Sequence, residues 1–335
     1  MALIELREAG LYCPRGRFHI DPWKPVPTAL ITHGHGDHAR PGNERVVAAE
    51  AGLNILRKRL PDSELRGVPY GEELTFRGVK VSFHPAGHVL GSAQIRVEHA
   101  GEVWVVSGDY KRAPDPTCAP FEPLACDVFI TEATFALPIY RWPPPGDVAR
   151  EIAQWWRDNA AAGRASVLYA YILGKSQRIL AELARLDDLP ERVVYTHGAT
   201  QKMVQIHRDA GVRMLDTRLV ADEPKKTAWS GRLVLAPPSV RRSPWVRRFG
   251  KHETAFASGW MQLRGTRRGR GLSRGFALSD HADWPALLRT VEESGASRVL
   301  CTHGFADALA RHLREQGVDA ESLETRFDGE DGAES

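Results

Sequence analysis

Residues 33–38 read His33-Gly34-His35-Gly36-Asp37-His38, which places three imidazoles and one carboxylate within six positions. The run follows the short apolar stretch 29–32, which is predicted to be a strand. Burying these polar groups without partners would cost roughly several kcal/mol of desolvation free energy per group. Imidazole nitrogens and carboxylate oxygens are zinc ligands, and glycine spacers let neighbouring side chains converge. The stretch therefore predicts a metal-binding loop at the end of a strand.

Four further candidate ligands lie in glycine-flanked turns or directly after predicted strands. They are His88 in the turn 85–92, Asp109 after the strand 103–106, His281 after the run that ends at Leu278, and His303 after 299–301. In α/β folds, ligands gather at the carboxyl ends of strands. Because one loop cannot supply two complete metal shells, we expect these side chains to complete the site.

Length and composition exclude several classes of protein. The chain has 335 residues, of which 42% are hydrophobic and 26% charged, as in ordinary soluble globular proteins, and about two domains are expected. The four cysteines form no C-x-x-C pair, residues 1–10 do not have the pattern of a leader peptide, and no apolar run is long enough for a membrane span. Secreted, membrane and collagen-like classes are excluded, and a cytoplasmic location is expected.

The order of predicted elements changes along the chain. Residues 1–135 mix short strands with one helical stretch at 47–60, and a proline-rich segment at 138–145 marks a domain border. A helix is predicted over 147–159 with Asp147 as its N-cap, and strands alternate with helices from there to about residue 210. This alternation is typical of a parallel α/β layer. The last 60 residues return to the mixed pattern of the first part.

Positive charge is concentrated in one region. The net charge is only +3, but residues 241–274 carry ten Arg or Lys against one acid, Glu253. Such a patch is suited to phosphates, and the alternative is an ordinary solvated loop surface.

The spaced motifs resemble a known fold. The order H-x-H-x-D-H, then A-G-H at 86–88 and S-G-D at 107–109, resembles the metallo-β-lactamase fold, an α/β fold in which two sheets form an αββα sandwich. Glu132, His281 and His303 resemble motifs A, B and C of the β-CASP nucleases, which insert an α/β cap into that fold. The resemblance implies a metallo-β-lactamase domain at 1–137 and 277–335, with a β-CASP cap at 138–276. The runs 278–284 and 301–305 resemble, more narrowly, the bacterial ligase-associated DNA exonucleases.

This resemblance implies roles for individual residues around two divalent ions, with zinc bound and manganese possible for activity. Implied ligands are His33, His35 and His88 for the first ion, Asp37, His38 and His303 for the second, and Asp109 for both. Asp37 would also orient a water, His281 would contact the scissile phosphate or protonate the leaving oxygen, and Glu132 would fix the tautomer of His281. Asp21 would brace the loop of residues 33–38, the histidine loop.

Candidate nucleic-acid contacts lie in the predicted cap. Lys175 and Ser176 stand at a helix start that could hold a phosphate, with an ordinary helix cap as the alternative. Trp260 could stack on a base or pack in the core, and the core is favoured. Arg264, Arg267 and Arg268 belong to a glycine-rich basic stretch suited to tracking phosphates.

The leading functional hypothesis is a metal-dependent DNA exonuclease acting 5′-to-3′ in DNA repair, with DNA ligase and helicase as partners implied by the resemblance. An RNA-processing nuclease is the first alternative, because RNA-acting members of the family carry His at motif C, as His303 does here. A small-molecule metallo-hydrolase is the second, since the fold hosts many chemistries, and a catalytically inactive binding module is the third. No membrane partner is expected.

Overall fold

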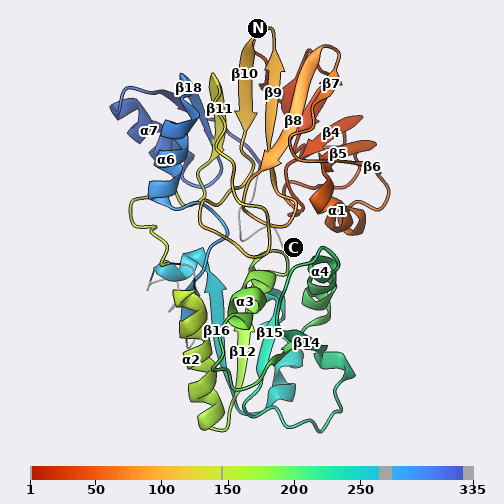
Figure 1. The fold of residues 1–335 in the computed structure, drawn as a ribbon, viewed down its shortest axis with the longest axis vertical. Coiled ribbons are helices and arrows are strands. Elements are labelled where there is room, and N and C mark those ends of the chain that lie inside the picture. Colours follow the sequence, from red (N-terminus) through yellow and green to blue (C-terminus); the bar gives the residue numbers. More distant parts are fainter. Residues whose placement is uncertain (1, 145, 264–273, 327–335) are drawn as a thin grey trace.

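The structure is a computed structural model that describes residues 2–144, 146–263 and 274–326. The described residues form three β-sheets with helices packed against them. The first two occupy one half of the molecule and the third occupies the other half (Figure 1). Helices lie against all three sheets, so the prediction of an α/β fold is confirmed.

The first sheet has the order β1-β2-β3-β4-β5-β6. Its strands are β1 (Glu5–Arg7), β2 (Gly10–Cys13), β3 (Phe18–Ile20), β4 (Thr28–Ile31), β5 (Arg45–Ala49) and β6 (Glu64–Val68). The strands β1 to β3 pair antiparallel, whereas β3 to β6 pair parallel. The strand β4 is central and buried along its whole length, which explains why its sequence is apolar apart from Thr28.

The second sheet has the order β19-β18-β11-β10-β9-β8-β7. Its strands are β7 (Leu74–Phe76), β8 (Val79–Pro85), β9 (Ala93–His99), β10 (Glu102–Val106), β11 (Val128–Glu132), β18 (Arg298–Thr302) and β19 (Asp319–Ser322). The strands from β7 to β10 form antiparallel hairpins, and β10, β11, β18 and β19 run parallel. The carboxyl ends of β10, β11 and β18 therefore meet at one edge.

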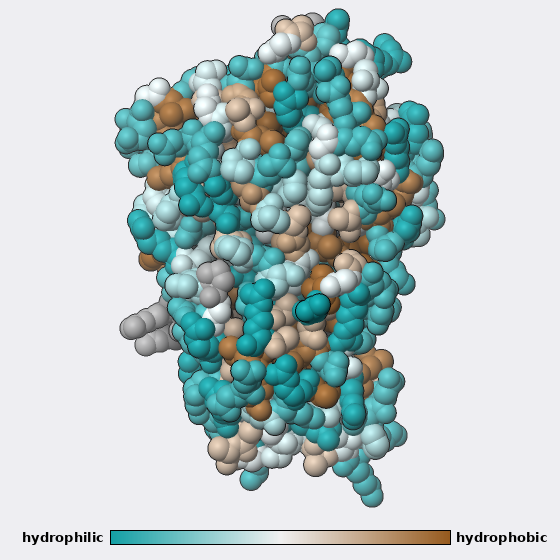
Figure 2. All heavy atoms as spheres, in the orientation of Figure 1, coloured by the Kyte–Doolittle hydropathy of each residue, from teal (hydrophilic) through white to brown (hydrophobic). Residues whose placement is uncertain are grey.

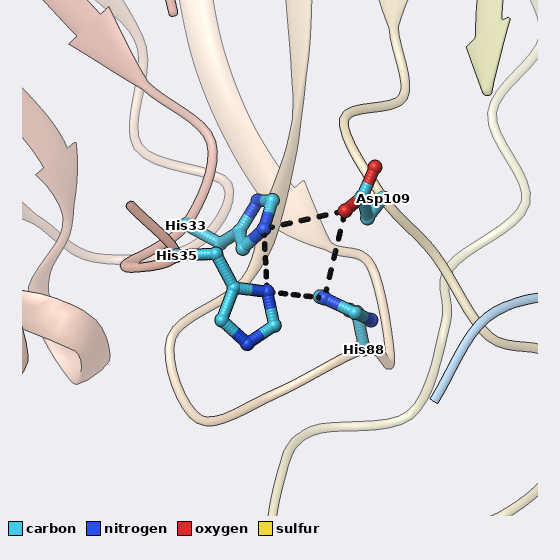
Figure 3. Close-up of side chains that lie close together, drawn as sticks. All are labelled: His33, His35, His88 and Asp109. Carbon is cyan, nitrogen blue, oxygen red and sulfur yellow. Dashed lines mark hydrogen bonds and ion pairs between the residues drawn. The ribbon is translucent and has the colours of Figure 1, made fainter. Parts of the chain in front are cut away.

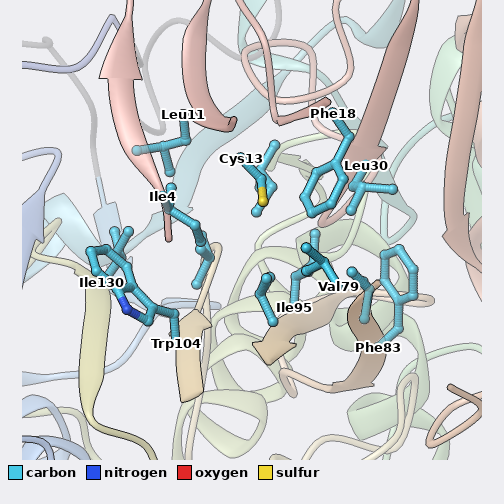
Figure 4. Packing of buried hydrophobic residues seen from close by; sticks show 14 of the residues in the cluster. Ile4, Leu11, Cys13, Phe18, Leu30, Val79, Phe83, Ile95, Trp104 and Ile130 are labelled. Atoms are coloured by element: carbon cyan, nitrogen blue, oxygen red, sulfur yellow. The ribbon is translucent and has the colours of Figure 1, made fainter. Parts of the chain in front are cut away.

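The first two sheets pack face to face around the largest hydrophobic core. Side chains of the first sheet, such as Leu11, Phe18 and Leu30, meet Phe83 and Ile95 of the second (Figure 4). Alternation along each strand sends every second side chain to this core and the others outward.

Three helices cover the outer faces of the sandwich. The helix α1 (Leu53–Arg59) packs Leu56 onto Ala29 and Val46 of the first sheet. The helices α6 (Trp284–Ser294) and α7 (Ala306–Glu315) cover the outer face of the second sheet. The layers therefore run helix, sheet, sheet, helix.

The third sheet is parallel throughout and has the order β14-β13-β15-β12-β16-β17. Its strands are β12 (Ala165–Tyr169), β13 (Val193–Thr196), β14 (Asp216–Leu219), β15 (Leu233–Ala236), β16 (His252–Ser258) and β17 (Arg274–Ala277). All six strands come from the part of the chain between β11 and β18. The helices α2 (Asp147–Ala161), α3 (Lys175–Ala184) and α4 (Gly198–Asp209) pack on one face.

Two local features differ from the sequence expectations. The residue that caps α2 is Gly146, with a φ of 88°, and Asp147 is the first residue inside the helix. The helical stretch expected at 47–60 is shorter, because residues up to Ala49 belong to β5.

The two halves of the molecule meet at a small apolar contact and through polar bonds near the histidine loop. Ile55, Leu90 and Leu173 form the apolar contact. On the face drawn in Figure 2, hydrophilic residues predominate and hydrophobic residues are visible mainly in small groups. No helix in the described ranges combines the length and the apolar character needed to cross a membrane.

Candidate metal centre

The histidine loop leaves β4 and turns sharply beside α1. The amides of His38 and Ala39 both donate to the carbonyl oxygen of His35, which closes a tight turn. A Cβ atom on Gly34 would lie 2.5 Å from Cγ2 of Ile55, closer than real side chains approach. Glycine is therefore required at position 34 for the loop to pack against α1.

The first cluster contains His33, His35, His88 and Asp109, whose candidate ligand atoms all lie within 4.8 Å of one another (Figure 3). Nδ1 of His35 lies 3.1 Å from Nε2 of His33 and 3.0 Å from Nε2 of His88. Oδ2 of Asp109 lies 3.4 Å from Nε2 of His33. Four groups from three separate loops thus converge on one point.

A second cluster contains His38, His303 and again Asp109. Nε2 of His38 lies 3.5 Å from Oδ2 of Asp109, and Nε2 of His303 lies 3.8 Å from Oδ1. The carboxylate of Asp37 lies beside this cluster, with Oδ2 at 3.8 Å from Nε2 of His38. Asp109 is therefore shared by the two clusters.

Each clustered imidazole uses its outer nitrogen to bond to a neighbouring oxygen. The pairs are His33 with the Thr32 hydroxyl, His35 with the Leu173 carbonyl, His38 with the Asp21 carboxylate, His88 with the Asp280 carbonyl, and His303 with the Thr302 hydroxyl. Bonds of this kind set the ring orientation and tautomer of metal-bound histidines. Here they direct the other nitrogen of every ring toward the clusters.

Asp21, for which the resemblance implies a bracing role, contacts both the start of the histidine loop and His38. Asp21 is buried, and its side chain accepts hydrogen bonds from the amide of Thr32 at 2.8 Å and from Nδ1 of His38 at 2.7 Å. The Thr32 hydroxyl also donates to it. Asp21 thereby ties the start of the histidine loop to the second cluster and lies outside the group of inward-facing ligands.

Burial and nearby carboxylates set the charge of these groups. Burial lowers the pKa of His35 and of His303 to about 4, and it lowers the pKa of His33 and His88 well below the usual value. Burial alone would also lower the pKa of His38, but the carboxylates of Asp109, Asp37 and Asp21 outweigh it and raise that pKa. Four imidazoles are therefore held in the neutral form that binds metals.

These residues fit a pair of divalent cations. In the part of the chain that the structure describes, no donor bonds to the buried atoms Oδ1 of Asp37 and Oδ1 of Asp109. Buried carboxylate oxygens without donors are costly unless a cation binds them. Imidazole with carboxylate suits zinc and neighbouring transition metals.

A third group links Asp109 to Glu132 and His281. Oε2 of Glu132, at the end of β11, bonds to Nδ1 of His281 at 2.9 Å, and that Nδ1 lies 4.0 Å from Oδ2 of Asp109. The amide of Tyr110 donates to the other Glu132 oxygen at 2.7 Å. His281 is thus held by a buried carboxylate at the border of the clusters.

The residues predicted to contact nucleic acid do not all lie where the sequence leads us to expect them. Lys175 and Ser176 are buried, and the ammonium of Lys175 lies 2.9 Å from Oδ2 of Asp280. This differs from the expectation of an accessible phosphate site. Trp260 is half-buried and packs on Phe135 with the ring centroids 4.8 Å apart, as the core interpretation expects. Arg264, Arg267 and Arg268 lie outside the described residues.

Two residues that the sequence reasoning did not single out support the centre. Leu173, after β12, bonds to His35 through its carbonyl, and Asp280 bonds to His88 in the same way. The Asp280 carboxylate also belongs to a buried cluster of charges with Lys111, Lys175 and Arg178. Its position next to His281 is the only sequence signal that could have pointed to it.

The fold and the site together define an α/β protein with a buried candidate metal centre at strand ends. No protein-family model matches the chain. The chain is 34% identical over 319 residues to the "Probable DNA ligase" of Opitutus terrae. The matched region covers 93% of this chain and 30% of that protein. It is 26% identical to "Ribonuclease TTHA0252" of Thermus thermophilus, over 58% of this chain and 48% of that protein. It is 30% identical to "Endoribonuclease YSH1" of Saccharomyces cerevisiae, over 35% and 15%.

The chain thus spans less than half the length of each of these relatives. A solved structure, "Crystal Structure of a Protein of Unknown Function from Enterococcus faecalis V583", matches with a TM-score of 0.58 at 12% identity. That match covers 90% of this chain and 79% of the other, and it supports the fold alone. The names printed for these curated relatives are those of ribonucleases and of a probable DNA ligase, so this chain is similar in sequence to enzymes of nucleic acids.

Proposed function

We propose that the protein is a metal-dependent nuclease that shortens DNA strands from their ends, 5′-to-3′, in DNA repair. The observation that carries the proposal is the carboxylate of Asp109, which two imidazole clusters share and which lies beside the His281–Glu132 pair. Relatives named as ribonucleases and as a DNA ligase support action on nucleic acid.

The proposal includes the domain organisation. Residues 1–137 and 277–335 would form a metallo-β-lactamase αββα sandwich, and residues 138–276 would form the β-CASP cap. Support comes from the third sheet, whose strands all lie within residues 165–277, between two neighbouring strands of the second sheet.

His33, His35 and His88 would hold one ion, Asp37, His38 and His303 the other, and Asp109 both. Bound in this way, two divalent ions, with zinc as the bound metal and manganese as a candidate for activity, would lower the pKa of a bound water and neutralise charge on a phosphate.

The protein's own groups then have separate tasks. Asp37 would accept a hydrogen bond from the attacking water and so orient it. Glu132 would accept a hydrogen bond from Nδ1 of His281 and so keep the proton on that nitrogen, which leaves Nε2 to contact the scissile phosphate or protonate the leaving oxygen. Asp37→Ala and His281→Ala should each abolish cleavage with the fold intact.

RNA is the second candidate substrate. The ribonuclease names among the relatives and the histidine at position 303 favour RNA, whereas the relationship over 93% of the chain to a protein named a probable DNA ligase favours DNA. That relationship also supports a functional association with a DNA ligase, and a helicase partner is proposed from the resemblance alone.

A matched-substrate digest tests the proposal. The purified protein, with added manganese or zinc, is given single strands of DNA and RNA of identical sequence, each with a 5′-phosphate and an internal label. DNA shortened stepwise while RNA survives is the expected result. RNA cut first, or cut internally, would place the protein with the RNA-processing enzymes, and turnover of a chromogenic lactam or thioester with neither strand cut would indicate a small-molecule hydrolase.

A further inference from the structure

A hollow of about 860 Å³ lies at the opposite end of the first sheet from the metal centre. Thr28 and Arg45, the first residues of β4 and β5, line it, whereas the histidine loop follows the other end of β4. At a rise of about 3.3 Å per residue, Thr28 lies about 17 Å from His33 along the strand direction. The hollow is therefore separate from the candidate metal centre.

Arginine is the most frequent residue in the lining of this hollow, which we call the arginine hollow. Its five arginines, all exposed, are Arg7, Arg17, Arg45, Arg66 and Arg77. They come from the strands β1, β5 and β6 and from the turns that follow β2 and β7. One lining residue, Glu64, carries a carboxylate. Scattered sequence positions thus build one strongly positive concave surface.

Most of this charge is not neutralised by the protein. Arg7 pairs with Glu5 and lies over the ring of Tyr12, 4.2 Å from its centroid. Among the described residues, no carboxylate lies within ion-pairing distance of Arg17, Arg66 or Arg77. Guanidinium groups bind phosphates through paired N–H donors, so these three are available to a ligand.

Two of the arginines stand where an arginine is unfavourable for the backbone. Arg17 has a φ of 56° and Arg77 a φ of 51°, in the left-handed region that favours Gly, Asn and Asp. Arg77 and Gly78 form the two-residue turn between β7 and β8, a position where Asn-Gly is the preferred sequence. Unfavourable residues held at such positions point to a function of their side chains.

A pair of rings in tilted contact also lines the hollow. Tyr12 and His19 lie with their centroids 4.5 Å apart, and both line the hollow. Burial lowers the pKa of His19, so its ring is neutral at pH 7. Aromatic faces beside arginines are a recurrent way to hold a strand whose bases are unpaired.

We propose that the arginine hollow binds the phosphate groups of a nucleic-acid single strand, as a second contact remote from the metal centre. The choice of a strand rests on the proposed nuclease function. It also rests on the spread of five guanidinium groups over a hollow larger than one phosphate would fill. The hollow and the metal centre are about 17 Å apart along the direction of β4. With one phosphate per 3.4 Å of strand in a regular helix, about five nucleotides would join the two sites.

The turn geometry provides a test that does not endanger the fold. In the double variant Arg17→Asn/Arg77→Asn, asparagine suits the left-handed backbone, so the thermal unfolding midpoint should stay equal or rise. Binding of a fluorescent 20-nucleotide strand with phosphorothioate linkages is followed by anisotropy at several salt concentrations, for DNA and for RNA. Losing two phosphate contacts should lower the slope of log Kd against log salt by about 1.4. The ratio of the variant's Kd to that of the wild type should therefore be about 25-fold larger at 0.1 M salt than at 1 M salt.

Two control variants separate the effects. Ala100→Asn makes the same change at another left-handed turn residue, where φ is 53°, without removing charge. Arg311→Gln removes an exposed arginine from α7. Both should bind the strand as the wild type does.

Several results would overturn the proposal. One is a double variant with the wild-type slope and Kd. Another is calorimetry in which inorganic tripolyphosphate binds the wild type but not the double variant while strand binding is unchanged, which would assign the hollow to a free polyphosphate. Loss of binding in the double variant of a protein that cuts no strand would refute the nuclease function and support the hollow. A wild type that cuts strands, together with a double variant whose salt slope is unchanged, would support the nuclease function and refute the role of the hollow.

Discussion

Replacing Asp21 by asparagine removes the brace of the histidine loop while keeping its shape. Asp21 has a φ of 43°, a conformation that asparagine also tolerates. The remaining carbonyl oxygen can still accept the Thr32 amide, but an amide nitrogen replaces the oxygen that accepts from the Thr32 hydroxyl and from Nδ1 of His38. His38 would then have to present Nδ1 as an acceptor and carry its proton on Nε2, the nitrogen that faces the cluster.

The structure sets the size of two effects of Asp21→Asn. Each hydrogen bond to a charged group contributes about 1.5–3 kcal/mol. With two lost and partial replacement by the amide, the free energy of unfolding should fall by about 3 kcal/mol. Loss of the outer bond to a metal-binding histidine lowers metal affinity by about 10–100-fold. The ion held by His38 should lose the most affinity, because Asp21 bonds to His38 directly and reaches His33 only through the Thr32 hydroxyl.

Zinc titrations against a chromophoric chelator, together with urea unfolding, measure both effects. Asp127→Asn is the matched control, because Asp127 accepts the Val103 amide at 2.7 Å in another part of the molecule. That control should lose some stability and no zinc affinity. If Asp21→Asn loses stability yet binds both ions with wild-type affinity, the bracing role at the metal centre is refuted.

Three other predictions concern the packing of the histidine loop, a buried carboxylate outside the metal centre, and the metal itself. Gly34→Val should lower zinc affinity and the thermal midpoint, because its Cβ would lie 2.5 Å from the Ile55 side chain, whereas Gly198→Ala, with its nearest neighbour atom at 3.9 Å, should change neither; a Gly34→Val protein with wild-type affinity would contradict the packing argument. Burial alone would raise the pKa of Asp115, but Lys111 and Arg178 lower it, so its stabilising contribution is complete above pH about 4 and is lost as the pH falls further. Asp115→Asn should therefore lower the free energy of unfolding by about 3 kcal/mol at pH 7 and flatten its decrease below pH about 4, as urea titrations at each pH would reveal; an unchanged pH profile would exclude this role. Removing metal with a chelator should lower the thermal midpoint, because Asp37 and Asp109 would keep buried oxygens without donors, and adding zinc back should restore it; a midpoint insensitive to both treatments would argue against a metal at these carboxylates.

Local sequence signals located much of the candidate site. The spacing of 33–38 and the loops after strands identified His88, Asp109 and His303, and the structure brings these together with the histidine loop. Such prediction works because a ligand that directly follows a strand is placed by that strand, and parallel strands end at a common edge.

Contacts between distant segments were not accessible in the same way. Lys175 lies at a helix start, which suggested a phosphate site. Its ammonium group instead pairs with the carboxylate of Asp280, 105 positions further along the chain. The five arginines of the hollow are isolated in sequence, and only the sheet brings them together. The cap of α2 was assigned to Asp147 because side-chain caps are frequent, whereas Gly146 provides a left-handed turn there.

The metal content of the wild type and of Asp109→Asn tests the central claim most directly. Protein purified in the presence of zinc is dialysed and analysed for metal per chain, with circular dichroism to verify folding. We predict two ions per chain in the wild type and at most one in Asp109→Asn, because Asp109 is shared by both clusters. A wild-type chain without metal, or a variant that keeps both ions, would contradict the account.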